Sequence, residues 1–226
     1  MKFIPLRTIV SFHTPILATL LIMVVAVACS DPENSEAPSD GPDIGFEYAP
    51  EERNYSQQQI AFWNSIQSHC GNAYEGRIAD ATPHYSNIAD AERIAIHVRD
   101  CTEDLIHISL HVDDDHSRNL LLTRESGTLR LKHDHRNPDG SEEVITMYGG
   151  DAPKPGLETR QIFEADDHTA EILPDRFDNF WFLDMMDEET FAYGVHWPKH
   201  GHSIRIEFNL AERVEAPPVP WGYEIR

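Results

Sequence analysis

The feature that most constrains the fold of this chain is a series of short segments in which apolar and polar residues alternate. In Leu105–Val112, every second residue from Ile106 onward is Ile, Leu or Val. Successive side chains of a strand point to opposite faces, so this pattern predicts a strand with one face in a core. We expect about nine such strands: Arg93–Cys101, Leu105–Val112, Leu120–Arg124, Thr128–Arg136, Val144–Tyr148, Thr159–Glu164, Phe177–Met186, Thr190–Trp197 and Ser203–Leu210.

Few helices accompany these strands. Ser56 and Gln59 have the spacing of a capping box, which predicts a helix that begins here and ends at Gly71. A second, short helix is expected over Asp166–Leu173. Strands that follow one another without alternating helices indicate an antiparallel all-β domain, and closure would remove its exposed edges. We therefore predict an antiparallel meander closed into a β-barrel and preceded by one N-terminal helix, with a two-sheet sandwich as the alternative.

The N-terminus has the pattern of an export signal. Lys2 and Arg7 precede a 13-residue apolar stretch, Ile16–Ala28. A cationic start, an apolar run of this length and small residues at its end are typical of a cleaved signal peptide. A transmembrane helix needs about 20 apolar residues, so an uncleaved anchor is the weaker alternative.

The end of this stretch, Ala26-Val27-Ala28-Cys29, resembles a bacterial lipobox. The resemblance implies cleavage after Ala28 and a lipid on Cys29, which would become the first residue of the mature chain. Leu is more usual at the position of Ala26. Ser30, where Asp would be found in other lipoproteins, resembles proteins sent to an outer membrane. We expect a cell-envelope protein held on the outer membrane, facing the periplasm, by its lipid.

Composition divides the rest of the chain. Residues 30–52 contain eight acidic residues, four prolines and no basic residue, which predicts an extended tether. The last residues are rich in proline as well. The expected organisation is a signal peptide over 1–28, an acidic tether over 29–54, a barrel domain over 55–212 and a C-terminal tail over 213–226.

Net charge argues against one class of partner. Loss of residues 1–28 would remove Lys2 and Arg7 and no acidic residue, so the formal charge of −21 would become −23. Such a chain repels nucleic acid, and we expect no nucleic-acid binding. Protein partners are not indicated by any motif.

Two cysteines remain once Cys29 carries a lipid, namely Cys70 and Cys101. An isolated pair in an oxidising compartment favours a disulfide, with two buried free thiols as the alternative.

Histidines are the main candidates for a site. On the predicted strand Thr128–Arg136, His133 and His135 share the inner face with the leucines that precede them. Two imidazoles at this spacing converge on one metal ion, so they are candidate ligands of a divalent metal. With Gly127 before them and Asp139 after, the segment partly resembles the first cupin motif. The alternative is that both histidines are hydrogen-bonded at the mouth of the barrel.

Other chemistry finds little support in the sequence. No nucleophile elbow, phosphate-binding loop or dinucleotide fingerprint is present. One aromatic group is expected to belong to the core or to line a ligand cavity: Phe177, Phe180, Trp181, Phe182, Phe191, Tyr193 and Trp197.

Several segments resemble a family of uncharacterised bacterial secreted proteins and lipoproteins, and the likeness covers most of residues 58–212. The segments are Phe62-Trp63 through Cys70-Gly71, Tyr74–Arg77, Leu129–Arg136 and Thr146–Asp151. The resemblance implies one domain and an envelope location. The layout of a helix followed by a strand meander also resembles lipocalin-type barrels, although Trp63 lies in the helix rather than at the first strand.

Three functions follow as hypotheses. The first is a non-enzymatic, lipid-anchored protein whose barrel binds a small or apolar ligand, for which a cavity of about 300 Å3 or more is expected. The second is a cupin-like, metal-dependent enzyme that uses His133 and His135. The third is a structural or interaction lipoprotein with a filled core and no ligand or cofactor.

Overall fold

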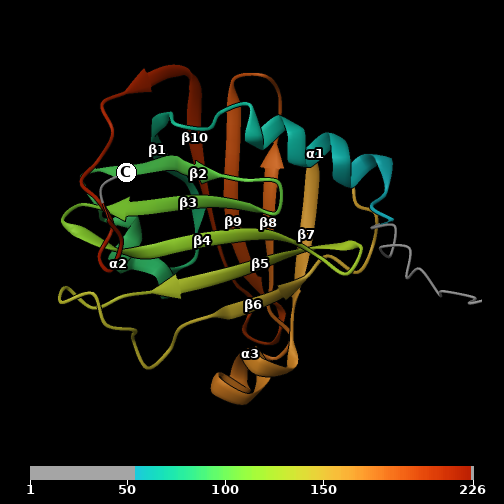
Figure 1. Ribbon diagram of the computed structural model, residues 1–226. Helices are drawn as coiled ribbons and strands as arrows, with labels where there is room; N and C mark the ends of the chain where they lie inside the picture. Colours follow the sequence, from blue (N-terminus) through green and yellow to red (C-terminus); the bar gives the residue numbers. More distant parts are fainter. Residues whose placement is uncertain (1–53, 225–226) are drawn as a thin grey trace, which may run out of the picture. The chain divides into compact units, whose positions relative to one another are not determined.

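A computed structural model describes residues 54–224 of the chain, apart from the side chains of Ser86 and Asn87. In this part of the chain, ten antiparallel strands form a closed barrel (Figure 1). Each strand pairs with its neighbours in sequence, and the first strand closes the barrel by pairing with the tenth. The prediction of an antiparallel meander closed into a barrel, with one helix ahead of it, is confirmed.

The strands come in the order β1 (Ala73–Ala81), β2 (Ile94–Cys101), β3 (Leu105–Val112), β4 (Asp115–Glu125), β5 (Thr128–His135), β6 (Tyr148–Asp151), β7 (Arg160–Ala165), β8 (Phe180–Met185), β9 (Thr190–Trp197) and β10 (His202–Val214). The helices are α1 (Gln57–Gln67), α2 (Ser86–Ala89) and α3 (Asp167–Ile172), with short 3-10 turns η1 (Pro83–Tyr85), η2 (Pro174–Arg176) and η3 (Pro198–His200). The short helix expected near residue 170 is therefore present as α3.

Helix α1 covers one end of the barrel, as Figure 1 shows. Its capping box forms as predicted, because the Ser56 hydroxyl accepts from the Gln59 amide and the Gln59 side chain accepts from the Ser56 amide, both at 3.1 Å. Phe62, Trp63 and Ile66 on its inner face are at most 2% exposed. Burying such side chains contributes about 1.5–3 kcal/mol each, so packing rather than helix propensity fixes α1 at this end.

The barrel interior is filled by side chains from alternate positions of the strands. Ile106, Ile108, Leu122 and Leu131 are fully buried there, together with the aromatic ring of Phe163. The alternation that predicts these strands therefore also identifies the side chains that make up the core.

One predicted strand is wrong. The segment Val144–Tyr148 is predicted as a strand, but only its last residue belongs to one, and Val144 is 98% exposed. The strand that pairs with β5 is β6, which contains Gly149 and Gly150. A β-carbon on Gly149 would lie 2.0 Å from a backbone oxygen of β5, so the close approach of the two strands requires glycine.

One observed strand was not predicted. Apolar and polar residues do not alternate regularly in β1, which also contains Gly76. The strand is bulged against β10 in two places, between Tyr74 and Gly76 and between Ile78 and Asp80. A bulge places two residues of one strand opposite one residue of its partner, which shifts the apolar period. The barrel consequently has ten strands rather than about nine.

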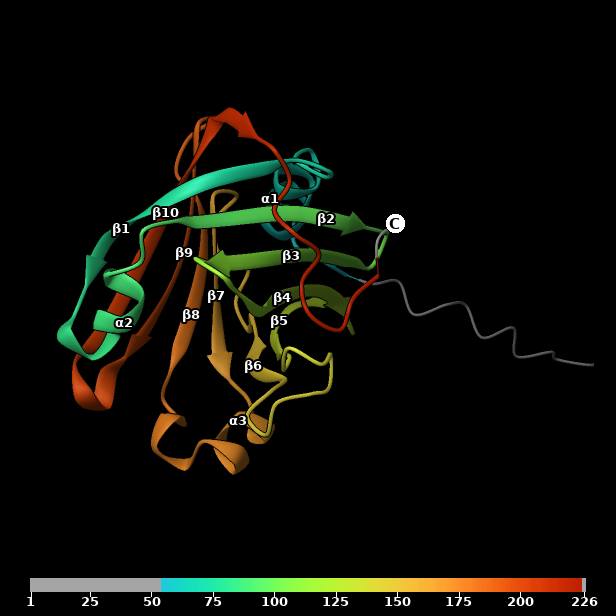
Figure 2. The ribbon, with the colours of Figure 1, turned by 90° about the vertical axis from the view of Figure 1, so that its left-hand side faces the viewer.

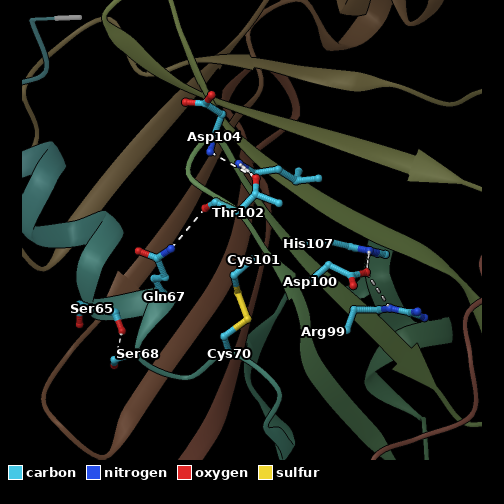
Figure 3. The surroundings of a disulfide bond; sticks show 11 residues. Ser65, Gln67, Ser68, Cys70, Arg99, Asp100, Cys101, Thr102, Asp104 and His107 are labelled. Carbon is cyan, nitrogen blue, oxygen red and sulfur yellow. Dashed lines mark hydrogen bonds and ion pairs between the residues drawn. A yellow bond between two sulfur atoms is a disulfide. The ribbon is translucent and has the colours of Figure 1, made fainter. Parts of the chain in front are cut away.

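Cys70 and Cys101 form a disulfide, as predicted, with their α-carbons 6.2 Å apart. The bond joins the turn after α1 to the end of β2 (Figure 3). The Gln67 side chain adds a hydrogen bond of 3.2 Å to the carbonyl of Thr102 beside it. The helix that covers the barrel is thus tied to the sheet covalently and by a hydrogen bond.

The C-terminal tail packs against the outside of the barrel. Strand β10 continues to Val214, and the segment after it passes over β2 and β3 (Figure 2). Trp221 donates its amide to the carbonyl of His116, and Arg99 donates to the carbonyl of Glu224. The tail therefore covers polar groups that would otherwise face solvent.

The signal peptide, Cys29 and all of the tether up to residue 53 lie outside the described residues, so what the sequence indicates about them stays a prediction. Among residues 54–224, no helix is long and apolar enough to cross a membrane.

Reduction of the Cys70–Cys101 disulfide should lower the free energy of unfolding by about 3–4 kcal/mol, because the bond closes a loop between cysteines 31 residues apart and so restricts the unfolded chain. Urea unfolding with and without a thiol reductant measures the difference. The Cys70→Ala/Cys101→Ala double variant should match the reduced protein and be insensitive to reductant. Equal stability of oxidised and reduced protein would contradict this expectation.

Candidate functional site

A cavity of about 80 Å3 lies at the end of the barrel opposite α1. Its walls come from the ends of the strands and from the short segments η1, α2 and η2. The lining residues are Tyr85, Ile88, Leu110, Arg118, Leu120, His133, His135, Tyr148, Arg176, Trp181, Tyr193, Val195, Ile204 and Ile206. Six of these residues are aliphatic, and the others carry charged or hydrogen-bonding side chains. The cavity is far smaller than the expected 300 Å3.

His133 lies on the inner face of β5, as its spacing predicts, and is 2% exposed. Its Nδ1 atom is 3.1 Å from the carbonyl oxygen of Tyr148, which can only accept, so Nδ1 carries the proton. Its Nε2 atom therefore accepts from the Tyr193 hydroxyl at 2.9 Å. Burial lowers the pKa of His133 to about 3, with a smaller contribution from His135, so the ring is neutral.

His135 lies two residues after His133 on β5 and lines the same cavity. The Tyr148 hydroxyl is 3.0 Å from its Nε2 atom, and Glu143 is 3.8 Å from Nδ1. Burial, followed by the charge of Arg118, lowers the pKa of His135 to about 4. The Tyr148 ring stacks on His133 at 4.7 Å and contacts His135 at 5.4 Å. Burial raises the pKa of Tyr148 to about 12, so its hydroxyl keeps its proton.

These hydrogen bonds bear on the candidate metal site. The structure brings His133 and His135 to one cavity, and their Nε2 atoms meet the hydroxyls of Tyr193 and Tyr148. A metal ion at His133 would have to displace the Tyr193 hydroxyl. Within residues 54–224, no group of three or more His, Cys, Asp or Glu side chains is arranged to hold a metal ion. The observed arrangement corresponds to the alternative in which both histidines are hydrogen-bonded at the barrel mouth.

Three cavity residues were missed by the sequence reasoning. Arg118 shares the inner face of β4 with Leu120, and this arginine two residues before a core leucine was the available signal. Tyr85 and Arg176 lie in 3-10 turns far apart in the sequence, where no periodicity indicates a direction. Their meeting in one wall depends on barrel closure.

The hydroxyl group of Tyr85 is one of several buried polar groups without a hydrogen-bond partner in the described part of the chain, and Tyr85 lines the cavity. The residue is 8% exposed. Leaving such a group unpaired costs about 1–3 kcal/mol, so a partner in the cavity is expected. Tyr148 and Tyr193 line the same cavity as Tyr85, so three phenol groups contribute to one wall.

Arg176 is the second charged residue of the wall. It has no carboxylate partner within residues 54–224, and its guanidinium lies 4.8 Å from the Trp197 ring. Arg118 pairs with Asp115, which does not line the cavity. The two guanidinium groups are thus the charged groups of a wall whose histidines are neutral.

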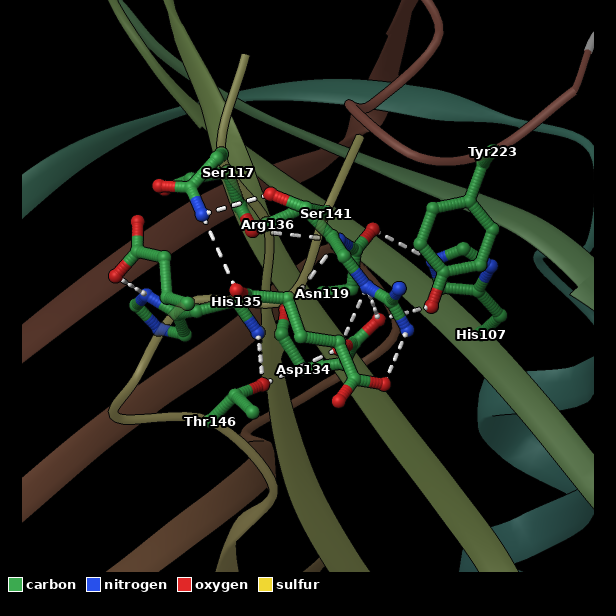
Figure 4. Close-up of polar contacts among 12 residues, drawn as sticks. His107, Ser117, Asn119, Asp134, His135, Arg136, Ser141, Thr146 and Tyr223 are labelled. Carbon is green, nitrogen blue, oxygen red and sulfur yellow. Dashed lines mark hydrogen bonds and ion pairs between the residues drawn. The ribbon is translucent and has the colours of Figure 1, made fainter. Parts of the chain in front are cut away.

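A second polar cluster lies outside the barrel, beneath the C-terminal tail (Figure 4). Asp134 lies on the outer face of β5, opposite to that of His133 and His135, yet it is fully buried because the tail covers it. Its carboxylate accepts from Arg136 at 2.9 Å, from the Tyr223 hydroxyl at 2.5 Å and from Thr146 at 3.2 Å. His107 joins the same surface through Asn119 at 2.8 Å. Every oxygen of Asp134 is used internally, which indicates a role in fixing the tail.

The predicted aromatic group divides between two places. Trp181, Phe191, Tyr193 and Trp197 are buried on the inner face, as expected for core residues. Phe180 and Phe182 instead face outward, beside a surface groove of about 350 Å3 that also includes Ile162, Arg160 and Arg205. Phe177 is 57% exposed. The aromatic residues therefore do not surround one internal ligand cavity.

No protein family profile, curated protein or solved structure matches this chain. The resemblance to secreted proteins and lipoproteins thus stays an interpretation of the quoted segments. The site has to be interpreted from its own geometry.

Acid should destabilise the protein in a way that depends on its buried histidines. Burial lowers the pKa values of His111 and His133 to about 3, well below the ordinary 6.5. Between these values the unfolded chain binds more protons, so the stability is fully present above about pH 6.5 and is lost as the pH falls. Between pH 7.5 and 5, each histidine should remove about 2 kcal/mol.

Urea unfolding at both pH values measures this loss, and His133→Gln should reduce it by about 2 kcal/mol. His111→Gln provides an independent variant if the first does not fold. An unchanged pH dependence in both variants would contradict the assignment.

Proposed function

We propose that this protein is a non-enzymatic, lipid-anchored cell-envelope protein whose barrel binds a small polar ligand in the cavity opposite α1. The observation that carries the proposal is the cavity wall, in which the buried Tyr85 hydroxyl has no hydrogen-bond partner among residues 54–224. Buried polar groups are as a rule hydrogen-bonded, and in this proposal a molecule bound in the cavity supplies the partner. The lipid on Cys29 and the outer-membrane location rest on the N-terminal sequence pattern.

The size and polarity of the cavity favour this ligand over an apolar one. A cavity needs about 10–15 Å3 to hold one water molecule, and we take the same volume for each non-hydrogen atom of a ligand. A cavity of about 80 Å3 therefore accepts about five to eight such atoms. An apolar molecule the size of a fatty acid or a drug would have to displace the buried core. The polar end of the wall, with Arg118 and Arg176, also favours a molecule that hydrogen-bonds.

A second candidate is the structural or interaction lipoprotein without a ligand. The filled interior favours it, because a barrel packed with buried leucine, isoleucine and phenylalanine side chains is a rigid scaffold in its own right. In that case ordered water would pair with Tyr85. The ligand experiment decides between the two candidates.

Ligand binding at the cavity should be blocked by filling it. A library of small polar compounds is screened against the full-length, detergent-solubilised protein by ligand-observed NMR. Val195→Phe places a phenyl ring in the wall and should abolish binding, whereas the same change at Val144, which is 98% exposed, should leave binding unchanged. Val195→Leu is the milder variant if the larger ring disturbs the fold.

The outcomes of this screen are distinct. If the ligand still binds to both Val195 variants, its site lies elsewhere on the protein. Absence of binding in the unmodified protein would favour the scaffold.

The lipid anchor has its own test. Cys29→Ser should abolish lipidation, leaving residues 1–28 attached or the protein free of a lipid, and mass spectrometry of the N-terminal peptide detects either result. Ser30→Asp is the matched control, because it keeps Cys29 and should retain the lipid while moving the protein between membranes. A lipid-free N-terminus in the natural protein would contradict the proposal.

A further inference from the structure

The charge of the cavity wall is unusual for this chain. The sequence has 39 acidic and 18 basic residues, and eight arginines of the described part pair with carboxylates. Arg176 has no such partner within residues 54–224, although acidic residues are in excess. An unpaired guanidinium in the wall of a cavity is available to a ligand of opposite charge.

Arg118 adds a second guanidinium group to this wall from another element of the fold. It projects inward from β4, whereas Arg176 comes from η2, and both line the same cavity. The ion pair with Asp115 uses the Nη1 atom of Arg118. The carboxylates of Asp115 and Glu143 contact the wall residues Arg118 and His135, and neither Asp115 nor Glu143 lines the cavity.

The tyrosine hydroxyls of the wall donate hydrogen bonds, and they favour an anionic ligand over a neutral one. The Tyr193 and Tyr148 hydroxyls are already engaged with the two histidines. The Tyr85 hydroxyl has no acceptor in the described part of the chain. Tyr85 lines the same cavity as the two arginines, and an oxyanion supplies several acceptors for its hydroxyl.

We propose that the cavity binds a small oxyanion, a carboxylate or a phosphate, between Arg118 and Arg176, with the Tyr85 hydroxyl donating to it. This inference rests on the proposed function, since it names the chemical class of the ligand. The planar fork of each guanidinium matches the oxygen geometry of both groups. The volume of about 80 Å3 limits the anion to about five to eight non-hydrogen atoms, which admits inorganic phosphate or a short-chain carboxylate.

The test is calorimetric titration of the full-length, detergent-solubilised protein with inorganic phosphate and with propionate, and with glycerol and urea as neutral probes of similar size. At least one anion should bind, and the neutral probes should not. Arg176→Gln should weaken anion binding at least tenfold. Tyr85→Phe should weaken it about fivefold without lowering the melting temperature, because the lost hydroxyl has no hydrogen-bond partner among the described residues.

Arg213→Gln is the matched control. Arg213 is exposed on β10, also has no carboxylate partner within residues 54–224, and does not line this cavity. Its replacement should leave anion binding unchanged. An equal loss in the Arg176 and Arg213 variants would show attraction by general surface charge and overturn the proposal.

The titrations with phosphate and with propionate distinguish the two candidate oxyanions. Binding of phosphate alone would identify a phosphate site, and binding of propionate alone a carboxylate site. If neutral compounds from the NMR screen bind and Val195→Phe blocks them, while no anion binds, the oxyanion class is overturned and the proposed function stands. If nothing binds at the cavity, both fail.

Discussion

The pairing of β1 with β10 is the constraint on which the rest of this structure depends. It joins Ala73 to Val214 at one end of the ladder and Ala81 to Ile204 at the other. Without it the sheet would have two open edges, and its apolar face would not enclose a core. Gly76 allows this contact, because a β-carbon there would lie 2.4 Å from the Phe208 ring of β10.

Closure also gives the barrel two chemically different ends. At the end covered by α1, Arg124 of β4 lies over the Trp63 ring at 4.4 Å, and the interior beside it is apolar. At the other end, Arg118 of the same strand lines a cavity with tyrosines and neutral histidines. The inner face of β4 thus carries an arginine near each end, and of the two only Arg118 lines the cavity described above.

Much of the fold follows from local patterns in the sequence. Alternation gives the bounds of Leu105–Val112 and Thr190–Trp197 as the structure has them, because both are long strands with one face in the core. The same argument fails for β1, where glycine and two bulges interrupt the period. It also fails at Val144, whose apolar side chain lies in an exposed loop. A local pattern does not show which strands pair with each other. This explains both the missed strand β1 and the wrongly predicted strand at Val144.

The site was less predictable than the fold. Periodicity places His133 on the inner face, since direction along a strand is a local property. It does not give the partner of each ring nitrogen, and those partners, Tyr148 and Tyr193, come from β6 and β9. Tyr85 and Arg176 reach the cavity from irregular segments, so their proximity arises only when the barrel is closed.

The position of the disulfide has a consequence for the order in which this chain folds. Cys70 and Cys101 are both synthesised long before β10, and their loop contains β1 and the whole of β2. Oxidation can therefore precede closure and hold the first two strands together while β1 still has an unpaired edge. The last strand must then pair with the first across more than 120 residues. Contacts between residues so far apart in the sequence form slowly. During that interval the open edge of β1 is the part of the molecule most exposed to association with other chains.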